Sequence, residues 1–227
     1  MKIVVTGGAG FIGSNFCDFL ISKMHSVVVI DDLSTGHLSN IEFIRDNIDF
    51  FHEKVEDFDF AKLSNIDAVV HLAAQASVPV SIDCFKESSS TNLLGTISVM
   101  EYCQQQNIPL VYASSSAVYG NLPLGDDSVE IVDLLSPYAV DKYTMELYAK
   151  TSFKIHQLSS IGLRFFNVYG PRQDPTSPYS GVISIFADRL INGKNIVING
   201  GYQTRDFVYV DDVIHALYKS IKVCLDS

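Results

Sequence analysis

Short runs of apolar, mostly β-branched residues alternate with longer amphipathic stretches over the first two thirds of the chain. Near-continuous apolar runs are typical of strands that are buried on both faces. They predict strands at residues 2–6, 26–30, 48–55, 66–72, 109–114 and 160–166. Helical periodicity between them predicts helices at 11–23, 84–106 and 136–150. Because strands and helices alternate, we expect an α/β fold with a doubly wound parallel sheet.

Residues 167–181 interrupt this pattern, since prolines and glycines gather there. We expect a loop and a domain boundary at this point. The prediction is a first domain at 1–166 and a smaller lobe at 167–227, of which 206–222 packs back on the first domain. The elements expected in the lobe are a helix at 181–192, a hairpin around Asn199-Gly200-Gly201, a strand at 206–210 and a helix from Asp211.

Composition limits the choice of partners. The chain has 227 residues, of which 47% are hydrophobic, enough for one sizeable core or one domain plus part of a second. A net charge of −10 argues against a nucleic acid or an anionic membrane surface as partner. The chain shows no signal peptide and no apolar run that is long enough to cross a bilayer, so we expect a cytoplasmic protein. The four scattered cysteines predict buried free thiols in a reducing compartment, with no disulfide framework and no metal site: Cys17, Cys84, Cys103 and Cys224.

Tyr138 and Lys142 form the first candidate for chemistry. Ser136 can cap the predicted helix and Pro137 suits its first turn. Positions four apart lie on one helix face, so the phenol and the ammonium can point at the same place. A nearby cation favours phenolate, which would let Tyr138 act as a base below the usual pKa of about 10. The alternative is a surface tyrosine beside a solvated lysine.

A glycine-rich loop follows the first predicted strand and opens a helix. Gly7 suits a tight turn, Gly10 allows close approach of the backbone to a pyrophosphate, and Gly13 allows close packing of helix and strand. Together with Phe11 and Ile12 these residues are predicted to hold the phosphates of a dinucleotide at the helix N-terminus.

An acidic pair ends the second predicted strand. Asp31 can accept hydrogen bonds from both ribose hydroxyls, and its charge repels a 2′-phosphate, so NAD is expected rather than NADP. Asp32 is the next candidate for the same site. The alternative for both is a solvated loop. With the glycine loop before them, they predict a Rossmann-type NAD-binding domain.

The spacing Gly-x-x-Gly-x-x-Gly, together with Tyr-x-x-x-Lys, resembles the extended short-chain dehydrogenase/reductase family. Further stretches resemble the NAD-dependent nucleotide-sugar epimerases and dehydratases within it, and the likeness runs over nearly the whole length. These stretches are HLAAQASVPVS (71–81), TNLLGT (91–96), SSSAVYG (114–120), LRFFNVYGPRQDP (163–175) and QTRDFVYVDDV (203–213).

The resemblance implies a role for each matching residue. Tyr138 would be the acid/base, and Lys142 would hold the nicotinamide ribose and lower the tyrosine pKa. Ser115 would be the catalytic hydroxyl. Its neighbours Ser114 and Ser116 are the alternatives if the alignment is shifted by one residue. The cofactor would also be lined by Ala73, Ala74 and Asn92. The sugar nucleotide would be bound by Ser115, Ser116, Asn167, Val182 and Arg205.

Three of these assignments have structural alternatives. Arg205, implied at the diphosphate, suits paired charge-assisted bonds but can also form a salt bridge with Asp206 or Asp211. Asn167 can be a turn-former. His71 is better explained as a hydrogen-bonded histidine at a strand end.

The resemblance implies hydride transfer from the sugar C4 to NAD and a 4-keto intermediate. Related 4,6-dehydratases carry Asp-Glu after the catalytic hydroxyl residue, where this chain has Ser116 and Ala117. Neither is an acid, so the prediction is a UDP-hexose 4-epimerase-like enzyme. A 4,6-dehydratase and a uronate decarboxylase are the alternatives within the family.

Relatives in this family continue beyond the last predicted helix, whereas this chain stops at Ser227. We therefore also consider an NAD-binding but catalytically silent homologue whose sugar-nucleotide site is open on one side, and a reductase that releases NADH. The expected ligands are NAD and a nucleotide-diphosphate sugar, with a UDP-sugar first. Helices at 84–106 and 136–152 correspond to those that form dimers in the family, which leaves a homodimer open.

Overall fold

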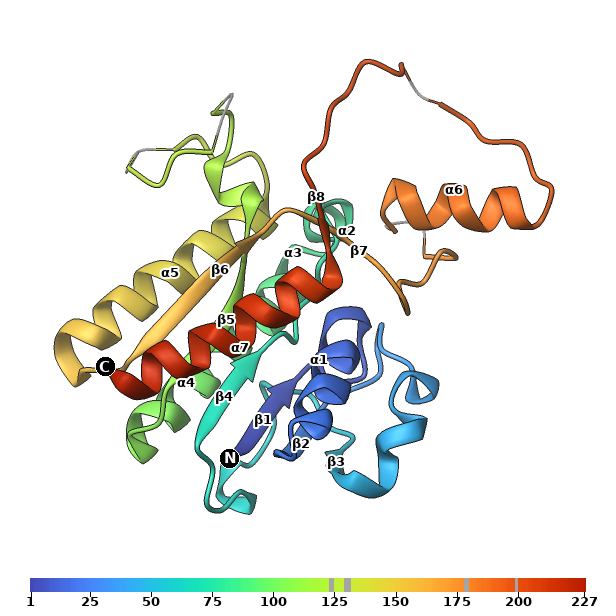
Figure 1. Ribbon diagram of the computed structural model, residues 1–227. Helices are drawn as coiled ribbons and strands as arrows, with labels where there is room; N and C mark the ends of the chain where they lie inside the picture. The colour runs from blue at the N-terminus through green and yellow to red at the C-terminus, as the bar shows by residue number, and fades with distance from the viewer. Residues whose placement is uncertain (123–124, 129–131, 178–179, 199) are drawn as a thin grey trace.

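The computed structural model describes residues 1–122, 125–128, 132–177, 180–198 and 200–227. Within them, six parallel strands form one sheet in the order β3-β2-β1-β4-β5-β6 (Figure 1). The strands are β1 (Lys2–Thr6), β2 (Ser26–Ile30), β3 (Ile48–Phe51), β4 (Ala68–His71), β5 (Leu110–Ser115) and β6 (Ser160–Phe165). This is the order of a Rossmann-type sheet, whose two halves wind outward from the centre. The predicted α/β class is confirmed.

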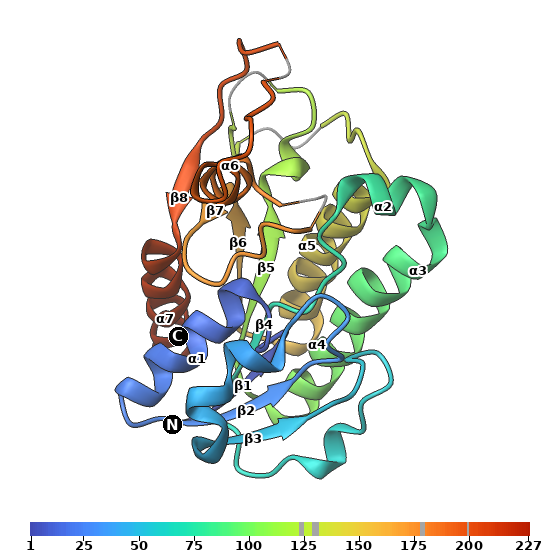
Figure 2. The ribbon, with the colours of Figure 1, turned by 90° about the vertical axis from the view of Figure 1, so that its right-hand side faces the viewer.

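Helices cover both faces of this sheet. Figure 2 shows α1 (Phe11–Ser22) and α7 (Val210–Asp226) on one face, and α4 (Gly95–Gln106) and α5 (Pro137–His156) on the other. Successive strand residues point to opposite faces, so each apolar run supplies two cores. Ile3 and Val5 belong to the core under α1 and α7, while Val4 belongs to the core under α4 and α5.

The helix predicted at 84–106 is confirmed as a helical stretch over residues 85–106. A separate helix α2 (Val78–Asp83) precedes α3 (Phe85–Ser89), and a π-helical turn η4 (Ser90–Leu94) joins α3 to α4. A π turn adds one residue to the helical turn and often marks a functional position. Here it carries the buried Asn92, whose partner Gln75 lies outside the helix.

Two short strands lie beyond the main sheet. β7 (Asn167–Tyr169) pairs in parallel with β8 (Phe207–Tyr209), and α6 (Val182–Ile191) comes between them in sequence (Figure 1). The prediction of a loop from 167 was therefore wrong for the residues of β7. Asn199, in the predicted hairpin, lies outside the described residues, and the described neighbours 200–206 form no strand.

Short 3₁₀ turns complete the described elements: η1 (Leu38–Asn40), η2 (Glu42–Asn47), η3 (Phe60–Lys62) and η5 (Ser116–Tyr119). In the described part of the chain, no helix is long and apolar enough to span a bilayer. All four cysteines are free thiols, and three are buried as expected, but Cys84 is exposed between α2 and α3.

Candidate active site

The glycine loop forms the turn between β1 and α1. Gly7 has φ +69°, and a Cβ on it would lie 2.7 Å from the backbone nitrogen of Ala73. A Cβ on Gly13 would lie 2.1 Å from the Gly7 carbonyl oxygen. Both positions therefore need glycine, whereas a Cβ on Gly10 would meet only that same oxygen, at 3.2 Å. Gly10 caps α1 without a side-chain hydrogen bond, so the first N–H groups, at Phe11 and beyond, are left for an anion.

Asp31 lies buried at the end of β2, beside this loop. Its carboxylate accepts from the backbone N–H groups of Ala9, at 2.9 Å, and Leu33, at 2.8 Å. Burial raises the pKa of Asp31, and these two bonds oppose that rise. A carboxylate has about four acceptor sites, so capacity remains for ribose hydroxyls. Asp32 instead accepts from Ser34 at the surface. The loop and Asp31 fit a dinucleotide.

The turn after β4 closes the other side of this region. Ala73 donates its backbone N–H to the Thr6 hydroxyl at 3.2 Å, and Ala74 follows it, half-buried. Asn92 lies behind the turn, fully buried, where its amide accepts from the Gln75 N–H at 2.8 Å and donates to the Gln75 carbonyl at 3.1 Å. Asn92 thus fixes the shape of the turn from the π-helical element η4.

Ser115, Tyr138 and Lys142 come together from β5 and α5. Ser136 caps α5 by accepting from the Ala139 N–H at 3.2 Å, which confirms the predicted helix start. Ser115 lies close to Tyr138, and its side chain acts to lower the pKa of the phenol. The buried Lys142 ammonium donates to the Ala113 carbonyl at 2.8 Å and lies 5.8 Å from the tyrosine ring centroid.

The electrostatics of this group differ from the expectation. Burial raises the pKa of Tyr138 above its ordinary value of 10.0, and the Ser115 bond only opposes this. Lys142 is not among the causes of this shift and its ammonium donates to the Ala113 carbonyl, so a lowering of the Tyr138 pKa by Lys142 stays a prediction. Burial also lowers the pKa of Lys142 to about 8, with Asp141 acting in the opposite direction.

The three neighbouring serines have distinct surroundings. Ser114 is buried and donates to Glu146 at 2.5 Å. Ser115 ends β5 and accepts from the Ala117 N–H at 3.1 Å while it contacts Tyr138. Ser116 begins the 3₁₀ turn η5. Contact with Tyr138 therefore favours Ser115 as the catalytic hydroxyl, and that role stays a prediction.

The residues predicted at the sugar nucleotide lie in the β7–β8 part of the chain. Asn167 donates its backbone N–H and its side-chain amide to the Asp206 carbonyl, each at 3.0 Å. Arg205 is exposed and donates to its neighbour Thr204, and within the described residues it forms no ion pair. Val182 begins α6 and is partly exposed. Among the described contacts, no hydrogen bond or ion pair joins these residues to the serine–tyrosine–lysine group.

His71 has a structural role, as expected. Its ring nitrogens lie 2.7 Å from the Thr6 hydroxyl and 2.9 Å from the Thr96 hydroxyl, and burial lowers its pKa to about 3. The described residues contain no group of three or more histidine, cysteine or acidic side chains placed to hold a metal ion.

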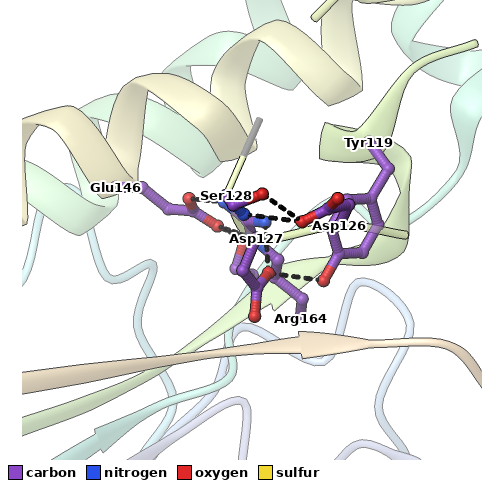
Figure 3. Close-up of polar contacts among 7 residues, drawn as sticks. Tyr119, Asp126, Asp127, Ser128, Glu146 and Arg164 are labelled. Atoms are coloured by element: carbon purple, nitrogen blue, oxygen red, sulfur yellow. Dashed lines mark hydrogen bonds and ion pairs between the residues drawn. The ribbon is translucent and has the colours of Figure 1, made fainter. Parts of the chain in front are cut away.

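The sequence prediction missed one polar cluster beside the candidate site. Arg164, Glu146, Ser114, Tyr119 and Asp127 are linked by hydrogen bonds and ion pairs (Figure 3). One signal was available, since Glu146 follows Lys142 by four residues on the same helix.

The sheet order and this site define an NAD-binding enzyme of the short-chain dehydrogenase/reductase class. The model of the NAD dependent epimerase/dehydratase family matches residues 3–224, and the chain belongs to that family. The predictions of the family, of an NAD-dependent enzyme and of NAD as the cofactor are confirmed.

Individual relatives support this membership. The chain is 36% identical to the UDP-glucose 4-epimerase of Mycolicibacterium smegmatis, over 97% of this chain and 73% of the relative. It is 40% identical to a solved UDP-N-acetylglucosamine 4-epimerase from Methanobrevibacter ruminantium, with a TM-score of 0.91 over 97% of this chain and 73% of the other. A solved UDP-glucose 4-epimerase from Thermus thermophilus, in complex with NAD, is 36% identical with a TM-score of 0.86 over 97% of this chain and 74% of the other. A dTDP-D-glucose 4,6-dehydratase of Dictyostelium discoideum is a more distant relative, at 31% identity over 95% of this chain and 54% of its own length.

Proposed function

We propose that this protein is a nucleotide-sugar 4-epimerase. The observation that carries the proposal is that Ser115 of β5 and Tyr138 and Lys142 of α5 lie close together, with Lys142 buried. A hydroxyl and a phenol that lie close together, with an ammonium nearby, can hold and move one proton at a sugar hydroxyl. The epimerase names of the relatives at 36–40% identity support the same reaction.

In the proposed reaction, the Ser115–Tyr138 pair takes the proton from the sugar 4-hydroxyl and later returns it. NAD, held by the glycine loop and Asp31, would supply the hydride acceptor and donor that interconversion at C4 requires. Removal of the proton needs Tyr138 as phenolate, and burial disfavours that form. Turnover should therefore rise with pH through neutrality. The Ser115 side chain opposes this effect of burial, because it acts to lower the pKa of the phenol.

Elimination and decarboxylation have less support. The 4,6-dehydratases that this sequence resembles carry an Asp-Glu pair where this chain has Ser116 and Ala117. Glu146 is the carboxylate bound to neighbouring Ser114, but it also accepts two hydrogen bonds from Arg164. It is therefore engaged and does not replace the missing acid.

For the substrate we propose a UDP-sugar. The named substrates of the solved relatives support this, as does a basic residue at Arg205, whose exposed guanidinium suits a diphosphate. Asn167 and Val182 are proposed at the same site. The free thiols suit a reducing compartment, and we propose the cytoplasm.

The test is incubation of the protein and NAD with UDP-glucose, UDP-N-acetylglucosamine and UDP-glucuronate, with the products separated by chromatography. We expect the C4 epimer of at least one, lost in Tyr138→Phe while NAD binding persists. A 4-keto-6-deoxy product would instead identify a dehydratase. NAD binding with no turnover of any substrate would support the catalytically silent alternative.

We further propose a homodimer formed through α4 and α5. Apolar side chains on the outer face of α5 are exposed, and a groove of about 200 Å³ runs between the two helices. The exposed residues include Leu147, Tyr148 and Ile155. Light scattering should show a dimer that Leu147→Glu dissociates. Phe43→Glu, at an exposed residue of η2, is the matched control and should leave the dimer intact.

A further inference from the structure

The polar cluster around Arg164 lies at the edge strand β6, beside an open groove of about 460 Å³. The arginine side chain is 23% exposed and that of Glu146 18%, whereas Asp127 is 80% exposed. The charged groups of Arg164 and Glu146 have lost most of their contact with water. They need hydrogen bonds to each other and to their neighbours to offset that loss.

The guanidinium of Arg164 binds two carboxylates at once (Figure 3). Its Nε and one terminal nitrogen donate to the two oxygens of Glu146, at 3.0 and 2.7 Å. The other terminal nitrogen donates to Asp127 at 2.7 Å, and the Tyr119 hydroxyl donates to the same Asp127 oxygen at 2.7 Å. The guanidinium carbon lies 4.8 Å from the Tyr119 ring centroid. Because the planar guanidinium is bound on both sides, it restricts the position of the Glu146 carboxylate.

Glu146 in turn connects the helix to the strand that bears Ser115. It lies on α5 one turn beyond Lys142 and two turns beyond Tyr138, so the three share a face. Its carboxylate accepts from the Ser114 hydroxyl at 2.5 Å, and Ser114 is opposite Arg164 in the β5–β6 register. Ser114 is therefore held by Glu146 and lies opposite Arg164. Ser115, the next residue of β5, lies close to Tyr138.

We propose that Arg164 is a positioning residue for the reaction: through Glu146 and Ser114 it sets the spacing between Ser115 on β5 and Tyr138 on α5. The inference rests on the proposed function, because it concerns the geometry of the same pair. A proton transfer depends steeply on such spacing, and a displacement of about 1 Å can cost about 100-fold in rate. The competing explanation is that the cluster only stabilises the edge strand.

The test compares single variants of the full chain. Arg164→Lys keeps the charge but loses the fork, and Glu146→Gln keeps the shape but loses the charge. For each we expect kcat to fall about 10- to 100-fold with KM for the sugar nucleotide within about threefold, and NAD binding unchanged. The two changes together should cost no more than the larger one, since they break one connection.

Two neighbouring aspartates give a graded comparison, in which Asp127 binds Arg164 and Asp126 is the matched control. Asp127→Asn removes the outer charge from Arg164, and we expect a fall of about two- to fivefold in kcat. Asp126 is adjacent, and its hydrogen bonds within the described residues go to Ser128, so Asp126→Asn should leave kcat unchanged. Variants of Arg164 and Glu146 that lose thermal stability but keep wild-type kcat at a temperature where they are folded would overturn the proposal.

A second measurement does not depend on turnover. The Ala117 N–H donates to Ser115, so its exchange with deuterium reports on this end of β5. In Arg164→Lys we expect the peptide covering 113–119 to exchange faster than in wild type. In Asp126→Asn the same peptide should exchange at the wild-type rate. If wild-type protein turns over no nucleotide sugar, the proposed function fails, while this exchange still tests the positioning. Unchanged exchange in Arg164→Lys would refute the inference by itself.

Discussion

Lys142 should make the folded protein less stable than its apolar replacement. The ammonium is 2% exposed and its burial lowers the pKa from 10.5 to about 8. At about 1.4 kcal/mol per pH unit, this corresponds to about 3 kcal/mol of destabilisation wherever both the folded and the unfolded lysine are charged. The protein bears this cost because the proposed site needs a cation there.

The perturbation is Lys142→Met, which keeps the length of the side chain and removes the charge. The Ala113 carbonyl loses its hydrogen bond to the ammonium, which costs about 1–2 kcal/mol. The variant should therefore be about 1–2 kcal/mol more stable than wild type at pH 7.

The pH dependence gives the sharper test. The lysine is mostly charged in both states at pH 7 and below, and half charged in the folded state at about pH 8. Between about 8 and 10.5 the folded lysine is neutral while the unfolded one still binds a proton, so the cost of burial shrinks as the pH rises. The advantage of the variant should thus fall by about 2 kcal/mol between pH 7 and pH 9.5, to zero or below.

Urea unfolding at the two pH values, followed by circular dichroism, measures this difference. Lys150→Met, at an exposed position on the same helix, is the control and should change stability by less than about 0.5 kcal/mol at both. A Lys142→Met protein that is less stable than wild type by the same amount at both pH values would refute the reasoning.

The remaining predictions concern the fold around the site. Gly13→Ala places a Cβ 2.1 Å from the Gly7 carbonyl oxygen, so we expect about 1–3 kcal/mol of destabilisation and loss of NAD binding, measured by urea unfolding and calorimetric titration. Full NAD affinity in this variant would contradict the assignment of the loop. Ser136→Ala removes the cap of α5 and should cost about 1 kcal/mol in urea unfolding. His71, with a pKa lowered to about 3 from 6.5, favours the folded state above pH 6.5 and loses that contribution as the pH falls toward 3. His71→Gln should therefore reduce the loss of stability between pH 7 and pH 4.5 by about 3 kcal/mol, and an unchanged loss would exclude this histidine as its source.

The sequence predicted correctly the parts of the site that are formed by residues close together in the chain. The start of α5 followed from Ser136 and Pro137, because capping and a fixed proline φ act within one turn. The glycine loop followed from residues within one turn of each other, where Gly7 and Gly13 must approach neighbouring backbone closely. The central strands followed from runs that are apolar at every position.

Features that depend on distant partners were missed. β7 pairs with β8 about 40 residues later, and its short, half-polar sequence carries no period. The π-helical turn within the helix predicted at 84–106 carries Asn92, which binds Gln75 in a turn of another segment. Arg164 meets Ser114 only through the β5–β6 register. The hydrogen bond from the Lys142 ammonium to the Ala113 carbonyl likewise depends on the packing of α5 on β5.

The packing of α7 against α1 has a consequence for the synthesis of the chain. Phe16 and Leu20 of α1 share one core with Leu217 and Ile221 of α7, so the first helix is covered by residues made about 200 positions later. While the ribosome is still translating the middle of the chain, this apolar face of α1 has no native cover. At about 5–20 residues per second, the interval lasts about 10–40 s, long enough for a chaperone to bind the emerging chain. Substitutions in α7 should therefore lower the yield of folded protein in cells more than their effect on the purified protein indicates.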